Sequence, residues 1–131
     1  MSTHLEIRGL DKVLRRLNEH QLDSMMRDAM RGVVDELQAE MMVYPPKPKQ
    51  STYVRTDKLK QSWAKRVTSS GRSWLGVVGN RIHYAPYVQD ENRQAAVHKR
   101  TGWQTVQSVA KDKKDWCVNF IHRAITRWAR S

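Results

Sequence analysis

The side chains best suited to acid–base chemistry lie between positions 83 and 100 of the sequence. They are His83, His98, Asp90, Glu91, Lys99 and Arg100. Imidazole exchanges protons near neutral pH, and such a set could in principle cleave RNA by general acid and base. No motif fixes the spacing of the two histidines, and loop histidines of this kind are more often structural. A small RNase-like enzyme therefore stays a rival hypothesis.

Other recognisable chemistry is missing from the sequence. It has no glycine-rich phosphate loop, no Walker lysine and no Gly-x-Ser-x-Gly elbow. His4, His20 and His122 fall on separate predicted elements, and the single Cys117 can close no disulfide within the chain. We therefore expect no catalytic residue, no cofactor and no metal.

The charge of the chain is strongly positive. The chain has 24 Lys and Arg residues and 13 Asp and Glu residues, which gives a net charge of +11 and a pI near 10.2. This favours a polyanionic or acidic partner, although the excess could serve solubility alone. Basic and aromatic residues alternate around positions 47–55 and 65–74, so a DNA- or RNA-binding protein is the main alternative function. The five tryptophans, however, fall largely at positions that a core would fill.

The length of 131 residues fits a single domain, 1–131. The longest apolar run, Met41 to Tyr44, is far shorter than the roughly 20 residues that cross a bilayer. The charged N-terminus does not fit a signal peptide, so we expect the protein to stay in the compartment where it is made.

Hydrophobic periodicity predicts the elements of the first half. A strand over 5–8 precedes Gly9, and apolar residues at helical spacing predict a short helix over 10–17. A second helix follows, whose apolar stripe runs from Leu22 to Leu37 and whose methionines we interpret as core. Its charged face is expected to be solvated. The proline-rich stretch 44–51 ends it as an extended loop, either an arm that reaches a neighbour or a plain connector.

The second half predicts an antiparallel hairpin over about 61–79 and a loop or short helix over 84–100. Thr101 to Gln104 has the spacing of a capping box, which predicts that a long C-terminal helix begins there. Lys113 is the one polar residue on the apolar face of this predicted helix, and the aliphatic part of its side chain can lie along the edge of the core. The fold is therefore expected to be α+β, with two N-terminal helices, a small sheet completed by the N-terminal strand, and a closing helix. No second hydrophobic core is indicated.

Several segments in order resemble the tail-completion or neck protein family (head–tail joining, minor tail component) of long-tailed bacteriophages. They are Gly9-Leu10, Tyr44-Pro45-Pro46, the stretch from Tyr53 to Trp63, Tyr84-Ala85-Pro86-Tyr87-Val88-Gln89, and His98 to Trp103. The elements Thr-Gly-x-Leu-x-x-Ser and Tyr-Ala-x-x-Val are the most specific. Asp57 stands where the family usually has glycine, which suggests a side-chain-capped helix start, and Gln89 to Asn92 replace a Glu-x-Gly-Thr segment.

The resemblance implies a non-enzymatic virion protein, assembled in the host cytoplasm into a hexameric or dodecameric ring in the neck or tail. The implied partners are the portal or connector and the tail-tube or tail-terminator proteins, with incidental contact with packaged DNA and none with membrane. Loops around 44–55 and 84–100 are expected to contact neighbouring subunits. The expected interface residues are Tyr53, Arg55, Tyr84, Tyr87, Arg93, Lys99 and Arg100. For Tyr84 and Tyr87 the alternative is packing over the sheet edge with the hydroxyls outward.

Overall fold

The computed structural model describes residues 4–7, 19–46, 57–70 and 73–130, with only the backbone of residues 4–7, 19 and 20. The elements in chain order are β1 (His4–Ile7), α2 (Glu19–Met41), α3 (Lys58–Gln61), β2 (Trp63–Ser70), β3 (Ser73–Asn80), α4 (Ala85–Gln89), α5 (Ala96–Arg100) and α6 (Val106–Arg130). A mixed helical and sheet fold, with a hairpin and a long C-terminal helix, is thus confirmed. The helix expected over 10–17 and most of the proline-rich loop lie outside the described residues.

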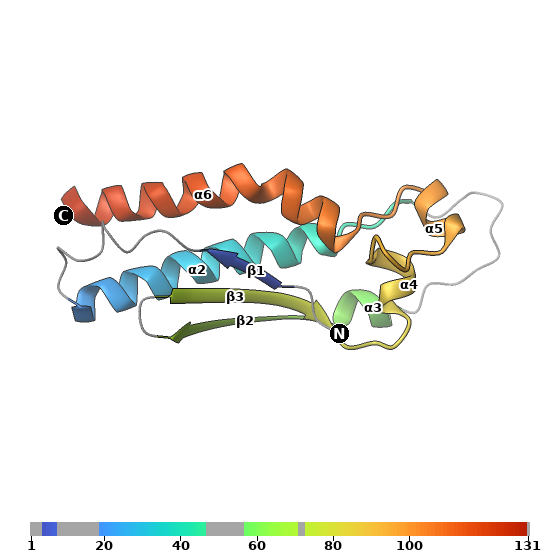
Figure 1. Ribbon diagram of the computed structural model, residues 1–131, viewed down its shortest axis with the longest axis horizontal. Helices are drawn as coiled ribbons and strands as arrows, with labels where there is room; N and C mark the ends of the chain where they lie inside the picture. Colours follow the sequence, from blue (N-terminus) through green and yellow to red (C-terminus); the bar gives the residue numbers. More distant parts are fainter. Residues whose placement is uncertain (1–3, 8–18, 47–56, 71–72, 131) are drawn as a thin grey trace.

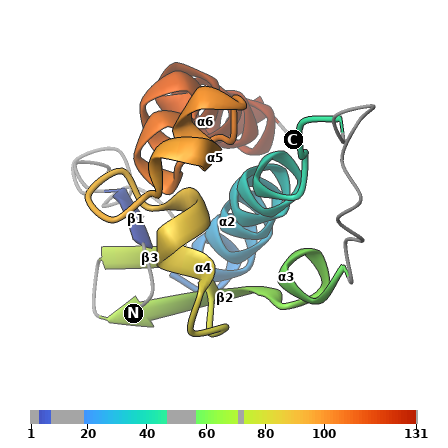
Figure 2. The ribbon, with the colours of Figure 1, turned by 90° about the vertical axis from the view of Figure 1, so that its right-hand side faces the viewer.

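The two long helices and the sheet form three layers. Helix α2 lies between the sheet and α6, and α6 runs back along it in the opposite direction (Figure 1). The short helices α3, α4 and α5 gather at one end of this body (Figures 1 and 2). No helix in the described parts of the chain is both long and apolar enough to span a membrane.

The sheet has the strand order β1-β3-β2, with antiparallel pairing on both sides of β3. Trp63 pairs with Asn80 and Ser70 with Ser73, so the hairpin predicted over about 61–79 is confirmed. It begins two residues later than expected because Gln61 closes α3. Every second residue of β3, from Trp74 to Asn80, is buried, as expected for a central strand with one face against helices.

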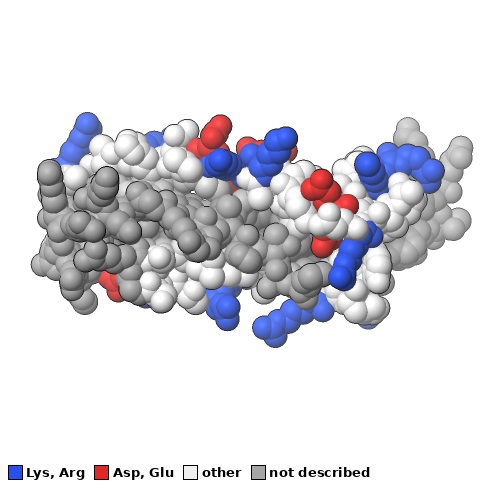
Figure 3. All heavy atoms as spheres, in the orientation of Figure 1, with Lys and Arg blue, Asp and Glu red and all other residues white. Residues whose placement is uncertain are grey.

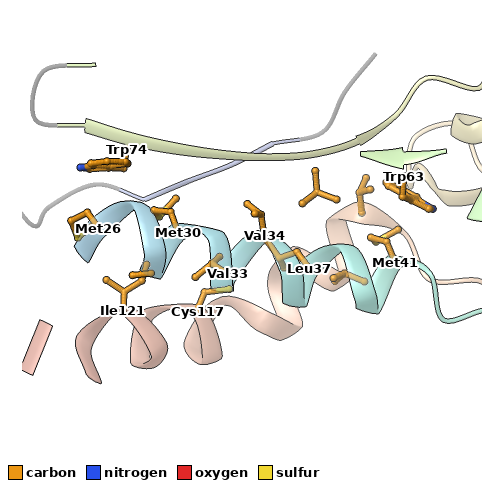
Figure 4. Close-up of a cluster of buried hydrophobic side chains, with 14 of the residues drawn as sticks. Met26, Met30, Val33, Val34, Leu37, Met41, Trp63, Trp74, Cys117 and Ile121 are labelled. Atoms are coloured by element: carbon orange, nitrogen blue, oxygen red, sulfur yellow. The ribbon is translucent and has the colours of Figure 1, made fainter. Parts of the chain in front are cut away.

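The core surrounds α2. Most of its predicted apolar stripe is buried, and Met26 and Met30 are core residues as predicted. Leu22 and Met25 are partly buried, and Met41, beyond the predicted stripe, belongs to the core as well. In the close-up, Met26 lies beneath Trp74 of the sheet, whereas Val33 faces Cys117 and Ile121 of α6 (Figure 4). Helix α2 is therefore covered on two sides, which explains why its apolar stripe is so regular.

Side chains on the charged face of α2 form ion pairs with the neighbouring layers, which the sequence did not predict. The ammonium of Lys65 on β2 pairs with Asp35. Lys113 on α6 is half-buried and lies 2.9 Å from Glu36 Oε1 and 4.0 Å from Glu40 Oε2. These ion pairs join α2 to both of its neighbouring layers. Asp28, Arg31 and Asp35 are exposed as expected, whereas Glu36 and Glu40 are half-buried beside Lys113.

The start of the last helix differs from the sequence prediction. Helix α6 begins at Val106, where Ser108 N donates to Thr105 Oγ1 (3.1 Å) and Thr105 N donates to Ser108 Oγ (3.0 Å). This reciprocal pair is the capping box. Thr101 instead ends α5: Gly102 has a φ of 86°, Trp103 N donates to His98 O, and Gly102 N donates to Lys99 O. That pattern is a Schellman motif, so Thr101 to Trp103 close one helix and do not start another.

Candidate interaction surface

A second small hydrophobic cluster lies at the end of the body that carries the short helices. We call this region, residues 57–62 and 81–104, the end lobe. Leu59, Ala85 and Val88 are buried there, and Tyr44, Ile82, Tyr84 and Trp103 pack around them. The sequence indicated no second core. Its members come from separate segments, none long enough to show a hydrophobic period, so only the fold brings them together.

Aromatic rings connect the end lobe to the body. The rings of Tyr44 and Trp103 lie 4.6 Å apart between centroids and are tilted by 42°. The Tyr44 hydroxyl accepts a hydrogen bond of 3.1 Å from the indole nitrogen of Trp63, which belongs to the main core. His98 meets Trp103 edge-on at 5.7 Å. The position of the lobe is therefore set by packed rings as well as by the chain.

Asp57 enters α3 with an unusual backbone. Its φ is 60° and its ψ is 8°, in the left-handed region, and its side chain makes no capping hydrogen bond. The expected side-chain-capped helix start was therefore wrong, because the carboxylate contributes nothing to the cap. The Asp57 carbonyl accepts from Gln61 N at 3.0 Å. The residue takes a conformation that glycine adopts without strain and that Asp tolerates better than most other residues.

Side-chain amides and backbone groups hold α4 and α5 together. Ala95 N donates to Tyr87 O at 2.8 Å, and His98 Nδ1 lies 3.1 Å from the same oxygen. Gln94 Nε2 donates to Val88 O at 2.8 Å and to Trp103 O at 3.1 Å. This network of hydrogen bonds fixes the backbone of α4 and α5, from which the exposed side chains project.

The predicted interface residues occupy different environments in the end lobe. Tyr84 is half-buried against the second cluster, whereas Tyr87 is 55% exposed. Arg93, Lys99 and Arg100 are all exposed, and Figure 3 shows Lys and Arg side chains gathered at the end where Figure 1 places α5. Tyr53 and Arg55 lie outside the described residues. The sequence missed Val97, 48% exposed on α5, because a single valine between two alanines and a basic run gives no periodic signal.

Three of the side chains considered for acid–base chemistry have packing or hydrogen-bonding contacts. His83 meets the Tyr84 ring edge-on at 5.4 Å, and His98 is held at the Tyr87 carbonyl. Asp90 Oδ1 accepts from Asn92 N and from Gln107 Nε2, both at 3.0 Å. Within the described ranges, no group of three or more His, Cys, Asp or Glu could hold a metal ion.

No protein-family model, curated protein or solved structure matches the chain. The strongest candidate for a functional site is therefore defined by the end lobe itself. Its backbone is fixed, and it exposes the aromatic ring of Tyr87, the aliphatic side chain of Val97 and three cations. Exposed aromatic and arginine side chains on a fixed scaffold are typical of protein–protein contacts.

Proposed function

We propose that this chain is a structural subunit of a tailed bacteriophage, located at the head–tail neck or the tail end. It assembles there as a ring, hexameric or dodecameric, that joins the connector to the tail. Its function resides in its surface and involves no catalysis.

The observation that carries this proposal is the convergence of the segments that resemble the phage family. Tyr44 comes from the Tyr-Pro-Pro segment, Leu59 from the segment that ends at Trp63, and Ala85 and Val88 from the Tyr-Ala-x-x-Val element. Together with Trp103, which ends the last of these segments, they form the second cluster of the end lobe. A chance resemblance would give no reason for these separate segments to pack together.

The backbone of Asp57 supports the same proposal. The family pattern has glycine at this position, and glycine is the residue that adopts a positive φ most easily. In this chain the position keeps a φ of 60° although it carries a side chain. The backbone at this position is therefore one that a glycine would also accept.

We assign contacts with neighbouring subunits to the outer side of the end lobe. Tyr87 and Val97 provide the apolar contact, and Arg93, Lys99 and Arg100 surround it with positive charge. Such an arrangement gives an interface both a desolvated centre and a polar rim. The portal or connector above the ring, or the tail tube below it, would contribute the opposing surface.

Deletion of the gene from the phage genome that carries it tests the proposal. The expected result is heads and tails that fail to join, or tails that are not completed, with recovery when the gene is supplied in trans. Mass spectrometry of wild-type particles should find the chain in a stoichiometry of a closed ring. Infectious, properly tailed virions made without the protein would refute the proposal. Sub-micromolar binding to generic duplex DNA that falls steeply with salt would instead support the alternative, a DNA- or RNA-binding protein.

A further inference from the structure

A small, partly open cavity lies where the end lobe meets the sheet. It is lined by Trp63, Gly79 and Asn80 from the hairpin, by Ala85, Pro86, Gln89 and Asp90 from α4 and its end, and by Val106 at the start of α6. It offers about 30 Å³ to the centre of a water-sized sphere. About 10–15 Å³ is enough for one water molecule.

The Gln89 side chain is oriented by the hydrogen bonds that its Nε2 group donates. It is only 2% exposed, and its Nε2 lies 3.3 Å from both Met41 O, at the end of α2, and Gln104 O, ahead of α6. Two carbonyl oxygens on the same side require the NH₂ group there, because the amide oxygen would be repelled by both. The assignment of oxygen and nitrogen in this amide is therefore determined by its surroundings.

The same orientation leaves Gln89 Oε1 buried without a hydrogen-bond partner. A buried amide oxygen without a donor destabilises a fold, so such atoms are nearly always satisfied by protein or by water. Gln89 lines the cavity, and Asn80 and Asp90 place further polar groups in its wall. The site thus combines room for one molecule, an acceptor that lacks a donor, and additional polar partners.

We infer that this cavity binds one ordered water molecule, which donates a hydrogen bond to Gln89 Oε1 and joins the end lobe to the hairpin. The inference does not depend on the proposed function. It identifies Gln89 as the residue that couples α4, the end of α2, the start of α6 and, through the water, the sheet.

The substitution Val106→Ile provides a test in which the two possibilities give opposite signs. Val106 is 9% exposed and lines the cavity, so one added methyl group would occupy the space. If the cavity holds a bound water, Val106→Ile expels it, leaves Gln89 Oε1 without a donor and lowers the midpoint of thermal unfolding. If the cavity is dry, the same substitution fills empty space and raises the midpoint.

The matched control is Val106→Ile in a Gln89→Met background, where no buried amide oxygen needs a donor. There the added methyl group should leave the midpoint unchanged or raise it. An equal rise in both backgrounds would overturn the inference. Should Gln89→Met fail to fold, a high-resolution crystal structure of the full chain decides alone. Density about 2.5–3.0 Å from Gln89 Oε1 supports a bound water, and an empty cavity overturns the inference.

Discussion

The ring of Phe120 on α6 lies directly against the backbone of Gly32 on α2. A Cβ atom at position 32 would lie 2.5 Å from Phe120 Cζ and 2.6 Å from Cε1, well inside van der Waals contact. The ring is not isolated, because it also stacks on Trp116 with centroids 5.0 Å apart and planes 18° from parallel. Gly32 therefore sets how closely the two long helices approach.

Gly32→Ala should lower the free energy of unfolding even though alanine is the better helix former. The overlap forces the Phe120 ring away from Trp116, at a cost of about 1–3 kcal/mol, against a gain of about 1 kcal/mol in helix propensity. Chemical denaturation of the variant measures the difference. In a Phe120→Ala background the overlap is removed, so Gly32→Ala should become stabilising by about 1 kcal/mol. The same loss in both backgrounds would show that the ring does not limit the helix approach.

The revised start of α6 makes a specific prediction about two threonines. Thr105→Ala should destabilise the protein by about 1 kcal/mol, since it removes the acceptor for Ser108 N at a buried helix end. Thr101 is exposed, and its hydroxyl donates only to carbonyls of the turn that it ends, so Thr101→Ala should change stability by less than about 0.5 kcal/mol. Urea unfolding of both variants compares them directly. A larger loss for Thr101→Ala would favour the earlier helix start.

The left-handed backbone of Asp57 can be tested by three substitutions. Asp57→Gly and Asp57→Asn should stay within about 0.5 kcal/mol of the parent protein, because both residues accept a positive φ and no side-chain cap is lost. Asp57→Ala should be less stable than Asp57→Gly by about 1 kcal/mol, because glycine has no Cβ and adopts a positive φ without strain. Thermal unfolding in one buffer ranks the three. Equal stability for alanine and glycine would argue against the left-handed conformation.

The parts of the fold that could be predicted from sequence are those that a single periodic segment determines. The stripe from Leu22 to Leu37 predicted α2 and its buried methionines, because the apolar residues that this helix contributes to the core recur at a helical period. The hairpin was likewise predictable from alternation and turn residues. Thr101 misled because Thr-x-x-Gln fits a helix start, whereas the neighbouring Gly102 fits a helix end and decided the geometry.

The end lobe could be predicted only in part. Exposure of Arg93, Lys99 and Arg100 followed from their charge. The inward packing of Tyr84 against Leu59 and Val88 did not, because these residues come from separate short segments. The burial of Gln89 could not be predicted, since a glutamine followed by Asp-Glu-Asn resembles a surface residue until the chain closes around it. Long-range packing, and not local propensity, sets this region.

The stability of the protein should fall at alkaline pH in part through Cys117. Burial raises the pKa of the Cys117 thiol, Glu36 raises it further, and Lys113 opposes both. The thiol in the unfolded chain ionises near pH 8.5, before the folded one, so the contribution of Cys117 is complete below that pH. It is lost as the pH rises through the higher folded pKa.

Cys117→Ala isolates this contribution, because it removes the titrating group and leaves the other ionisable groups in place. The difference in unfolding free energy between parent and variant should be constant up to about pH 8 and then shrink as the pH rises. Lys113, whose pKa is raised chiefly by its hydrogen bond to Glu36, loses its contribution at higher pH in both proteins. A difference that stays constant up to pH 10 would contradict the assignment to Cys117.

Substitutions of Tyr84 and Tyr87 distinguish the stability of the end lobe from its proposed contacts with neighbouring subunits. Tyr84→Ala should destabilise the isolated protein by about 1–2 kcal/mol, because it removes a ring packed on the second cluster. Tyr87→Ala should leave stability within about 0.5 kcal/mol, since the ring is largely exposed. In complementation of a deletion phage, however, Tyr87→Ala should reduce the yield of tailed particles at least tenfold, because a contact worth more than about 1.4 kcal/mol is lost at each ring position. Lys60→Ala, an exposed cation on α3 outside the assigned contact set, is the matched control and should complement fully. A fully functional Tyr87→Ala variant would remove the outer side of α4 from the interface.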